Sequence, residues 1–193
     1  MSRSRPRVLI ADDQPTLLDL FATWLEDEDI DLVRANCGDE ALSYCDDGDI
    51  DVAILDRHMP RVSGDEVLDA LREGASNPRV AFVTAAAPDV GIVDLDLDGY
   101  LTKPVTRDEY VGLVRSLIER ERLSETAERY VSNLSKRAAL LESESASVLR
   151  SDPTFAAFEE KLLRLAVRVD DRQLDDPLLS RAFADGGTID PTG

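Results

Sequence analysis

Five polar side chains in the first 103 residues follow or close short apolar runs of the chain. They are Asp12, Asp13, Asp56, Thr84 and Lys103. The runs are rich in Val, Ile and Leu, as strands buried on both faces of a parallel sheet are. Because the carboxyl ends of parallel strands open onto one crevice, we expect the five side chains to converge there.

The chemistry of this set is that of phosphoryl transfer to a carboxylate. Three carboxylates brought together repel one another unless a cation lies among them. Mg²⁺ suits such a site, because it takes oxygen ligands from carboxylates and a phosphate and keeps several waters. A lysine and a hydroxyl supply positive charge and a hydrogen bond to the anion. Each residue alone would more simply be a cap or a surface residue, and their joint occurrence at successive strand ends is what indicates a site.

The elements that must position these residues alternate along the chain up to about Arg122. The predicted strands are residues 8–11, 31–35, 52–55, 80–83 and 99–102. Helices are predicted where apolar residues recur at helical spacing, after Pro15, over residues 38–47 and after Gly64. This alternation predicts an α/β fold with a doubly wound, five-stranded parallel sheet.

The last third of the chain predicts helices without strands. Thr106 and Glu109 form a capping box, and the helix that starts there meets no proline before Pro153. A continuous helix from Thr106 to Arg150 would have about 45 residues and a length of ~68 Å. A second helix starting at Pro153 would complete an antiparallel helical hairpin, and a break near Ser124 is the alternative.

Residues 7–122 resemble the receiver domain of two-component response regulators. The motifs that carry the resemblance are Val8-Leu9-Ile10-Ala11-Asp12-Asp13, Ile54-Leu55-Asp56-Arg57-His58-Met59-Pro60, Phe82-Val83-Thr84-Ala85 and Tyr100-Leu101-Thr102-Lys103-Pro104. The resemblance implies a CheY-like, flavodoxin-like fold for this part of the chain, followed by the C-terminal helical hairpin.

The resemblance also assigns roles to the acidic residues. Asp56 would be the phosphoacceptor, which attacks a phosphohistidine on a partner sensor histidine kinase. Mg²⁺ would be bound by Asp13, by Asp56 and by the backbone carbonyl of His58, while Asp12 would support the metal through water. The chain would thus catalyse its own phosphorylation and dephosphorylation without being an enzyme for other substrates.

Three further residues match the switch of the family. Thr84 and Lys103 would each contact a phosphoryl oxygen, and Tyr100 matches the aromatic residue that moves inward with the threonine. The chain departs from the family between Thr84 and Lys103, where the connection is short and contains Gly91 with β-branched neighbours. We therefore expect the fourth helix of the family to be short or irregular here.

The C-terminal part has a second resemblance. Residues 135–142, Ser-Lys-Arg-Ala-Ala-Leu-Leu-Glu, are similar to part of HalX, a small helical domain attached to haloarchaeal receivers. The expected organisation is a disordered N-terminus (1–6), a receiver domain (7–122), a HalX-like hairpin (123–172) and a flexible acidic tail (173–193).

Composition narrows the remaining classes of function. The chain carries 40 acidic and 22 basic residues, a net charge of −18, which disfavours binding to nucleic acid and to anionic membranes. Its few lysines and many acids suit a high-salt cytoplasm, with an acidic mesophile protein as the alternative. No apolar run approaches the ~20 residues of a membrane span, and no signal peptide is evident, so we expect a cytoplasmic protein. Cys37, Cys45 and His58 are too few ligands for a zinc site.

Three classes of function are compatible with these residues to different degrees. The favoured one is a phosphorylation-dependent switch whose output is protein contact through the helical hairpin, to an output protein or to a second copy. A DNA-binding transcription regulator is the alternative, although residues 123–193 hold 9 basic and 13 acidic residues. An enzyme acting on phosphoesters is disfavoured, because His58 stands where a second acid would be needed. The apolar seam behind the association hypothesis consists of Leu134, Leu141, Phe155, Phe158, Leu162 and Leu165.

Overall fold

The computed structural model describes residues 5–46, 50–74 and 76–169. A five-stranded parallel sheet has the strand order β2-β1-β3-β4-β5. The strands are β1 (Arg7–Ala11), β2 (Asp31–Ala35), β3 (Val52–Leu55), β4 (Arg79–Thr84) and β5 (Gly99–Thr102). The predicted fold class and all five predicted strands are confirmed.

The described residues divide into two compact units. The first comprises the chain up to Ala86 together with Leu101–Ile118, and the second comprises Ala87–Tyr100 and the chain from Glu119 onward. The expected disordered N-terminus and acidic tail lie outside the described residues, apart from residues 5 and 6.

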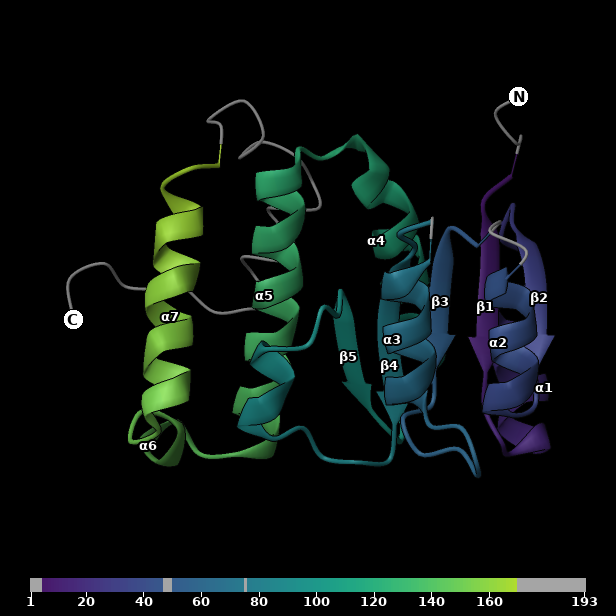
Figure 1. Cartoon of the computed structure of the whole chain (residues 1–193), viewed down its shortest axis with the longest axis horizontal. Coiled ribbons are helices and arrows are strands. Elements are labelled where there is room, and N and C mark those ends of the chain that lie inside the picture. The colour runs from purple at the N-terminus through teal and green to yellow at the C-terminus, as the bar shows by residue number, and fades with distance from the viewer. Residues whose placement is uncertain (1–4, 47–49, 75, 170–193) are drawn as a thin grey trace. The chain divides into compact units, whose positions relative to one another are not determined.

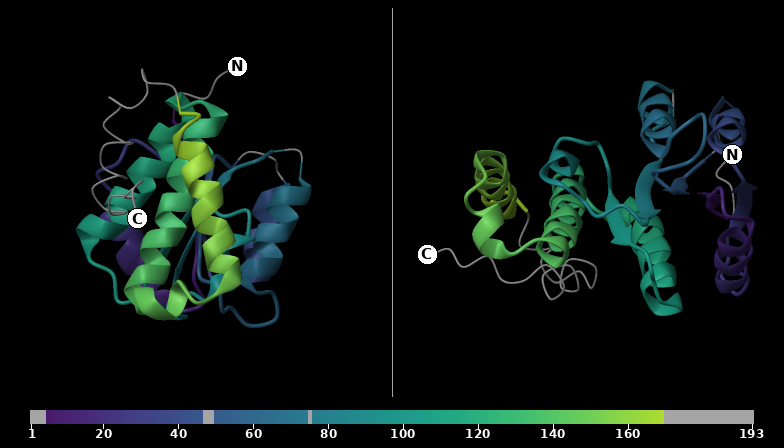
Figure 2. Two further views of the ribbon diagram at one scale, coloured as in Figure 1. Left: turned by 90° about the vertical axis from the view of Figure 1, so that its left-hand side faces the viewer. Right: turned by 90° about the horizontal axis from the view of Figure 1, so that it is seen from below.

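The first unit is a sheet covered by helices on both faces. Its helices are α1 (Pro15–Trp24), α2 (Gly38–Asp46), α3 (Gly64–Glu73) and α4 (Arg107–Glu119). The right-hand view of Figure 2 shows α1 and α4 on one face of the sheet and α2 and α3 on the other. Apolar side chains of β1, β3, β4, α1 and α4 form one buried cluster beneath the first of these faces. Burial on both sides explains why the central residues of these strands are apolar.

Local sequence signals set where α3 and α4 begin. Ser63 and Glu66 form a capping box at the start of α3, with both reciprocal hydrogen bonds present. Thr106 and Glu109 do the same for α4, as predicted, with the Thr106 amide donating to Glu109 Oε2 at 2.7 Å. These caps satisfy amides that a helix start otherwise leaves without partners.

The second unit contains the 3₁₀ turns η1 (Val90–Val93) and η2 (Arg120–Arg122) and the helices α5 (Glu125–Ser143), α6 (Ala146–Leu149) and α7 (Pro153–Ala166). The predicted continuous helix from Thr106 to Arg150 is wrong. α4 ends at Glu119, and the Ser124 hydroxyl accepts a hydrogen bond from the Ala127 amide to start a new helix. The alternative of a break near Ser124 is the one that the structure has.

The predicted hairpin is formed by α5 and α7, which run side by side in Figure 1. Asp152 accepts hydrogen bonds from two amides at the start of α7, as its position before Pro153 predicts. Leu134, Phe155, Phe158 and Leu162 of the predicted seam are buried in the single chain. These four side chains are therefore covered without a second copy of the chain, whereas Leu141 and Leu165 are half-buried.

Side chains of α5 and η2 bind the segment 87–100, which connects β4 to β5. Lys136 Nζ donates to the Leu95 carbonyl at 2.6 Å, and Arg120 donates to the Asp98 carbonyl at 2.8 Å. The Ser132 hydroxyl donates to Asp98 Oδ1 at 2.9 Å. The expected short fourth helix is confirmed as the single turn η1, so this segment satisfies part of its backbone through α5.

Lys136 of α5 is a buried lysine. Its side chain is 5% exposed, and burial lowers its pKa from 10.5 to about 8, with the charge of Lys161 adding to the effect. Asp94, Asp96 and Asp98 oppose this shift, since their negative charges favour the protonated amine.

Among the described residues, no helix is long and apolar enough to cross a membrane.

The lowered pKa of Lys136 makes a prediction about folding stability. Between pH values of about 8 and 10.5 the unfolded chain binds a proton that the folded chain has lost. The contribution of Lys136 to the free energy of unfolding therefore rises with pH across this window. In urea denaturation of the wild type and Lys136→Met, we expect the difference to move in favour of the wild type as pH rises. A difference that is independent of pH would contradict the buried position of the amine.

Candidate functional site at the carboxyl ends of the strands

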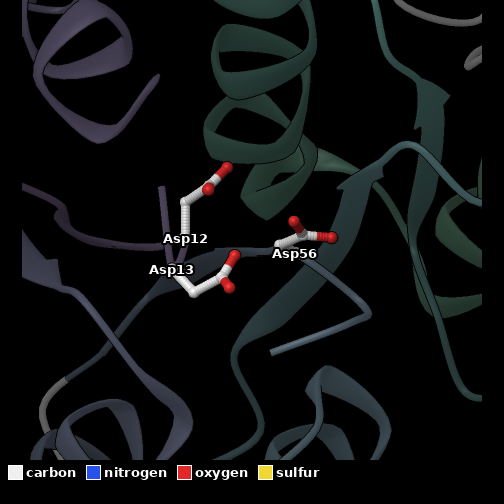
Figure 3. A group of neighbouring side chains, drawn as sticks. All are labelled: Asp12, Asp13 and Asp56. Atoms are coloured by element: carbon white, nitrogen blue, oxygen red, sulfur yellow. The ribbon is translucent and has the colours of Figure 1, made fainter. Parts of the chain in front are cut away.

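Three carboxylates meet where β1 and β3 end. One oxygen each from Asp12, Asp13 and Asp56 lies within 4.8 Å of the other two, and Figure 3 shows the three side chains around a common space. The Asp56 amide donates to the Ala11 carbonyl at 2.8 Å, which holds the ends of the two strands in register. The predicted convergence of these acidic residues is what the structure has.

Lys103 binds two of these carboxylates. Its Nζ donates to Asp12 Oδ2 at 2.6 Å and to Asp56 Oδ2 at 2.9 Å, and its side chain is 9% exposed. The Lys103 amide also donates to the Thr84 carbonyl at 2.8 Å, and the bond from Lys103 to Pro104 is cis. A shielded cation thus offsets the repulsion between two buried negative charges.

Thr84 and Tyr100, the predicted switch residues, are both buried. Thr84 ends β4, and its hydroxyl accepts a hydrogen bond from the Ala86 amide at 3.3 Å. This hydroxyl therefore stands at the strand end next to the backbone position of Lys103. Tyr100 lies in β5 and belongs to the second unit.

His58 approaches the acidic residues with its backbone. Its amide donates to Asp56 Oδ1 at 3.3 Å, while its side chain is exposed. Arg61 has a φ of 69°, so the loop between β3 and α3 contains a left-handed turn. The role of the His58 carbonyl as a metal ligand stays a prediction.

Asp12 is the carboxylate whose pKa is raised above its ordinary value. Burial is the largest cause, and the charge of Asp56 adds to it. The hydrogen bonds from Lys103 and from the Gln14 amide act in the opposite direction. The balance shows that the ionised form of Asp12 depends on donors, since burial by itself favours the neutral acid.

The structure places two further residues at or near the site to which the sequence analysis gave no role. Arg57 forms an ion pair with Asp65 at 2.9 Å and lies 5.9 Å from the ring centroid of Phe82. Tyr110 of α4 lines a cavity together with Asp12 and Asp56. One signal for Tyr110 was present in the sequence. Tyr110 lies one helical turn after the N-cap residue Thr106, at a core-facing position where an apolar side chain would be sufficient.

The sequence model for the response regulator receiver domain matches residues 8–115, which include all of the predicted acidic residues, Thr84 and Lys103. This chain belongs to the response regulator receiver family. Solved receiver domains agree with the match. The receiver domain of Francisella response regulator 1452 is 31% identical and covers 61% of this chain and 100% of its own, with a TM-score of 0.57. A CheY-like receiver from Methanospirillum hungatei is 26% identical and covers 62% and 98%, with a TM-score of 0.57.

Two longer relatives of this receiver protein are regulators of transcription by their descriptions. A protein of Haloferax volcanii described as a transcriptional regulator is 36% identical over 174 residues, or 87% of this chain and 30% of the relative. The transcriptional regulatory protein CpxR of Escherichia coli is 34% identical over 122 residues, or 62% of this chain and 52% of CpxR. The chain thus spans about half or less of these relatives.

Removal of the lysine that joins the carboxylates should destabilise the receiver. Lys103→Met leaves Asp12 and Asp56 buried without their shared cation, so we expect a loss of about 3 kcal/mol in unfolding free energy at about pH 8. The loss should be smaller at about pH 5, because burial raises the pKa of Asp12 and protonation of this one carboxylate relieves its repulsion with Asp56. Urea denaturation without divalent metal measures both values. An equal loss at the two pH values would show that Lys103 acts through packing alone.

Proposed function

We propose that this protein is a response regulator in which Asp56 accepts a phosphoryl group from a sensor histidine kinase. An Asp56 carboxylate oxygen would attack the phosphorus, forming an O–P bond as the N–P bond to the kinase histidine breaks. The single observation that carries this proposal is the carboxylate of Asp56, bound to Lys103 and grouped with two further acids. The membership of the chain in the receiver family supports the same role.

The acidic group fits a Mg²⁺ ion. Its donors are hard carboxylate oxygens, and their spacing lets three residues face one cation. Asp13, Asp56 and the His58 carbonyl would hold the metal, with Asp12 acting through water. When bound, the metal neutralises charge on the phosphoryl oxygens and on the acceptor.

The protein's own cation and hydroxyl supply the remaining contacts to the phosphoryl group. Lys103 Nζ already lies 2.9 Å from Asp56 Oδ2, so it would pair with a phosphoryl oxygen attached there. The Thr84 hydroxyl, whose oxygen accepts from the Ala86 amide, would donate its hydrogen to another phosphoryl oxygen. These residues and the metal would also assist the hydrolysis of phosphorylated Asp56, in which the phosphoryl group is transferred to water.

Phosphorylation would change the conformation of the segment between Thr84 and Lys103, and this segment would pass the change to the C-terminal helices. A shift of Thr84 and Tyr100 would move both ends of the segment 87–100. Lys136 and Ser132 of α5 are hydrogen-bonded to that segment, so α5 would respond to the same shift. The proposed result is a change in the surface that the C-terminal helices offer to other proteins.

We assign the receiver domain to residues 7–122 and the output domain to residues 123–172, of the HalX type. The match to a Haloferax volcanii protein extends over 87% of the chain and so includes most of the C-terminal helices. This match supports a domain of the type found in haloarchaea. An output protein is the preferred partner, because the apolar side chains Leu134, Phe155 and Leu162 are buried within the chain. A homodimer through other surfaces of the helices is the second choice.

Phosphorylation-controlled DNA binding remains the alternative function. The descriptions of the relatives as transcriptional regulators favour it. The charge of the described helices opposes it, since Arg164 of α7 is paired with Glu160 at 3.0 Å and Arg137 of α5 with Glu159 at 2.6 Å. Paired arginines provide little of the positive potential that phosphate contacts need.

The acceptor assignment is tested by phosphorylation of the full chain. Incubation with acetyl phosphate and Mg²⁺ should attach one phosphoryl group, and Asp56→Asn should abolish the reaction because the nucleophilic oxygen is changed. Asp69→Asn, at an exposed aspartate of α3, is the matched control and should react like the wild type. Intact-mass spectrometry gives the stoichiometry. Full labelling of the Asp56→Asn variant would overturn the assignment.

The two output modes are separated by a mobility-shift experiment. Phosphorylated full chain, unphosphorylated chain and the Asp56→Asn variant are each mixed with a pool of genomic DNA fragments at low salt. We expect no retention of fragments by any of the three, because the acidic helices repel the phosphate backbone. Retention of particular fragments by the phosphorylated chain alone would establish the DNA-binding alternative.

A further inference from the structure

The hydroxyl of Tyr110 is buried without a hydrogen-bond partner. The residue is 0% exposed, and no hydrogen bond of its hydroxyl oxygen is found in the described part of the structure. Burial of a hydroxyl without a partner costs free energy, so a group of this kind calls for a specific explanation, such as an ordered water. The pKa of the phenol is raised by burial and by the charge of Asp12, which keeps the hydroxyl protonated as a donor.

The ring of Tyr110 is held in one position. It stacks on Phe21 with ring centroids 4.3 Å apart and an interplanar angle of 9°. Trp24 meets it edge to face, with ring centroids 5.9 Å apart. The Tyr110 amide donates to the Thr106 carbonyl in the first turn of α4. A ring fixed by packing on α1 directs its hydroxyl to one place and loses little entropy when it donates a hydrogen bond.

A small cavity has Tyr110 in its wall. Its walls include Tyr110, Asp12 and Asp56, and the rest of its lining is mostly apolar. The volume of this cavity that the centre of a water molecule can occupy is about 10 Å³. One buried water needs ~10–15 Å³ and two to four polar partners, and the phenol with the two carboxylates supplies that number.

We propose that this cavity holds one ordered water, which accepts a hydrogen bond from Tyr110 and donates one to Asp12. Tyr110 is then a positioning residue for the acidic site, and its role rests on the proposed function of that site. Asp12 Oδ2 already accepts from Lys103 at 2.6 Å, and Oδ1 accepts from the Gln14 amide at 2.9 Å. Each carboxylate oxygen has a second acceptor direction, which the water fills from inside the protein.

The water and Tyr110 fix the orientation of Asp12 toward the metal. Asp12 is buried, so the orientation of its carboxylate depends on every donor that reaches it. Loss of an outer hydrogen-bond partner of a metal site commonly weakens metal binding by a factor of ~10–100. Tyr110→Phe retains the ring packing and removes only the hydroxyl, so it isolates this contribution.

The test is a Mg²⁺ titration of the full chain without a phosphodonor. Binding is monitored through the NMR chemical shifts of the Asp12, Asp13 and Asp56 amides. Tyr110→Phe should raise the half-saturating Mg²⁺ concentration about tenfold. Tyr130→Phe, which removes the hydroxyl of an equally buried tyrosine in the second unit, should change it by less than about twofold. Away from the acidic site, the amide shifts of Tyr110→Phe should match those of the wild type, which a general structural defect would not allow.

A high-resolution crystal structure supplies the independent measurement. Water density between Tyr110 and Asp12 in the wild type, absent in Tyr110→Phe, supports the proposal together with the shifted titration. An empty cavity, or a Mg²⁺ titration unchanged in Tyr110→Phe, overturns it. Failure of the proposed function is distinguishable, because it appears as a wild type that does not become phosphorylated on Asp56.

Discussion

The contact of one lysine with two buried carboxylates is the constraint on which the rest of this structure depends. Lys103 Nζ donates to Asp12 and Asp56, which come from the ends of two different strands. Buried charges of one sign are tolerated only when an opposite charge and hydrogen bonds compensate them. The parallel order of the strands provides this arrangement, because it brings three separate parts of the chain to one edge of the sheet.

The same constraint limits how the chain connects β4 to β5. Thr84 and Lys103 must be neighbours at the edge, and their backbones are joined by a hydrogen bond of 2.8 Å. The segment between them forms only a 3₁₀ turn, and side chains of α5 satisfy several of its polar groups. The C-terminal helices therefore form part of one compact unit with the segment that a response at the acidic site would move.

Most of the fold and of the site could be predicted from local signals. Apolar strands followed by Asp12, Asp13 and Asp56 are legible because strand ends in a parallel sheet have a common direction. The break between α4 and α5 could be predicted only as an alternative to a continuous helix, because helical spacing continues through a turn that only the cap at Ser124 marks. The contacts of Lys136 and the cavity at Tyr110 could not be predicted, since they depend on packing between distant segments.

Hydrogen exchange of the full chain tests most directly whether the acidic site controls the C-terminal helices. The phosphorylated wild type is compared with the Asp56→Asn variant treated with the same phosphodonor and Mg²⁺. The account predicts altered amide exchange in residues 90–95 and in the half of α5 that contains Lys136, with α3 unchanged. Changes confined to the loops around Asp56, with α5 exchanging as in the variant, would contradict it.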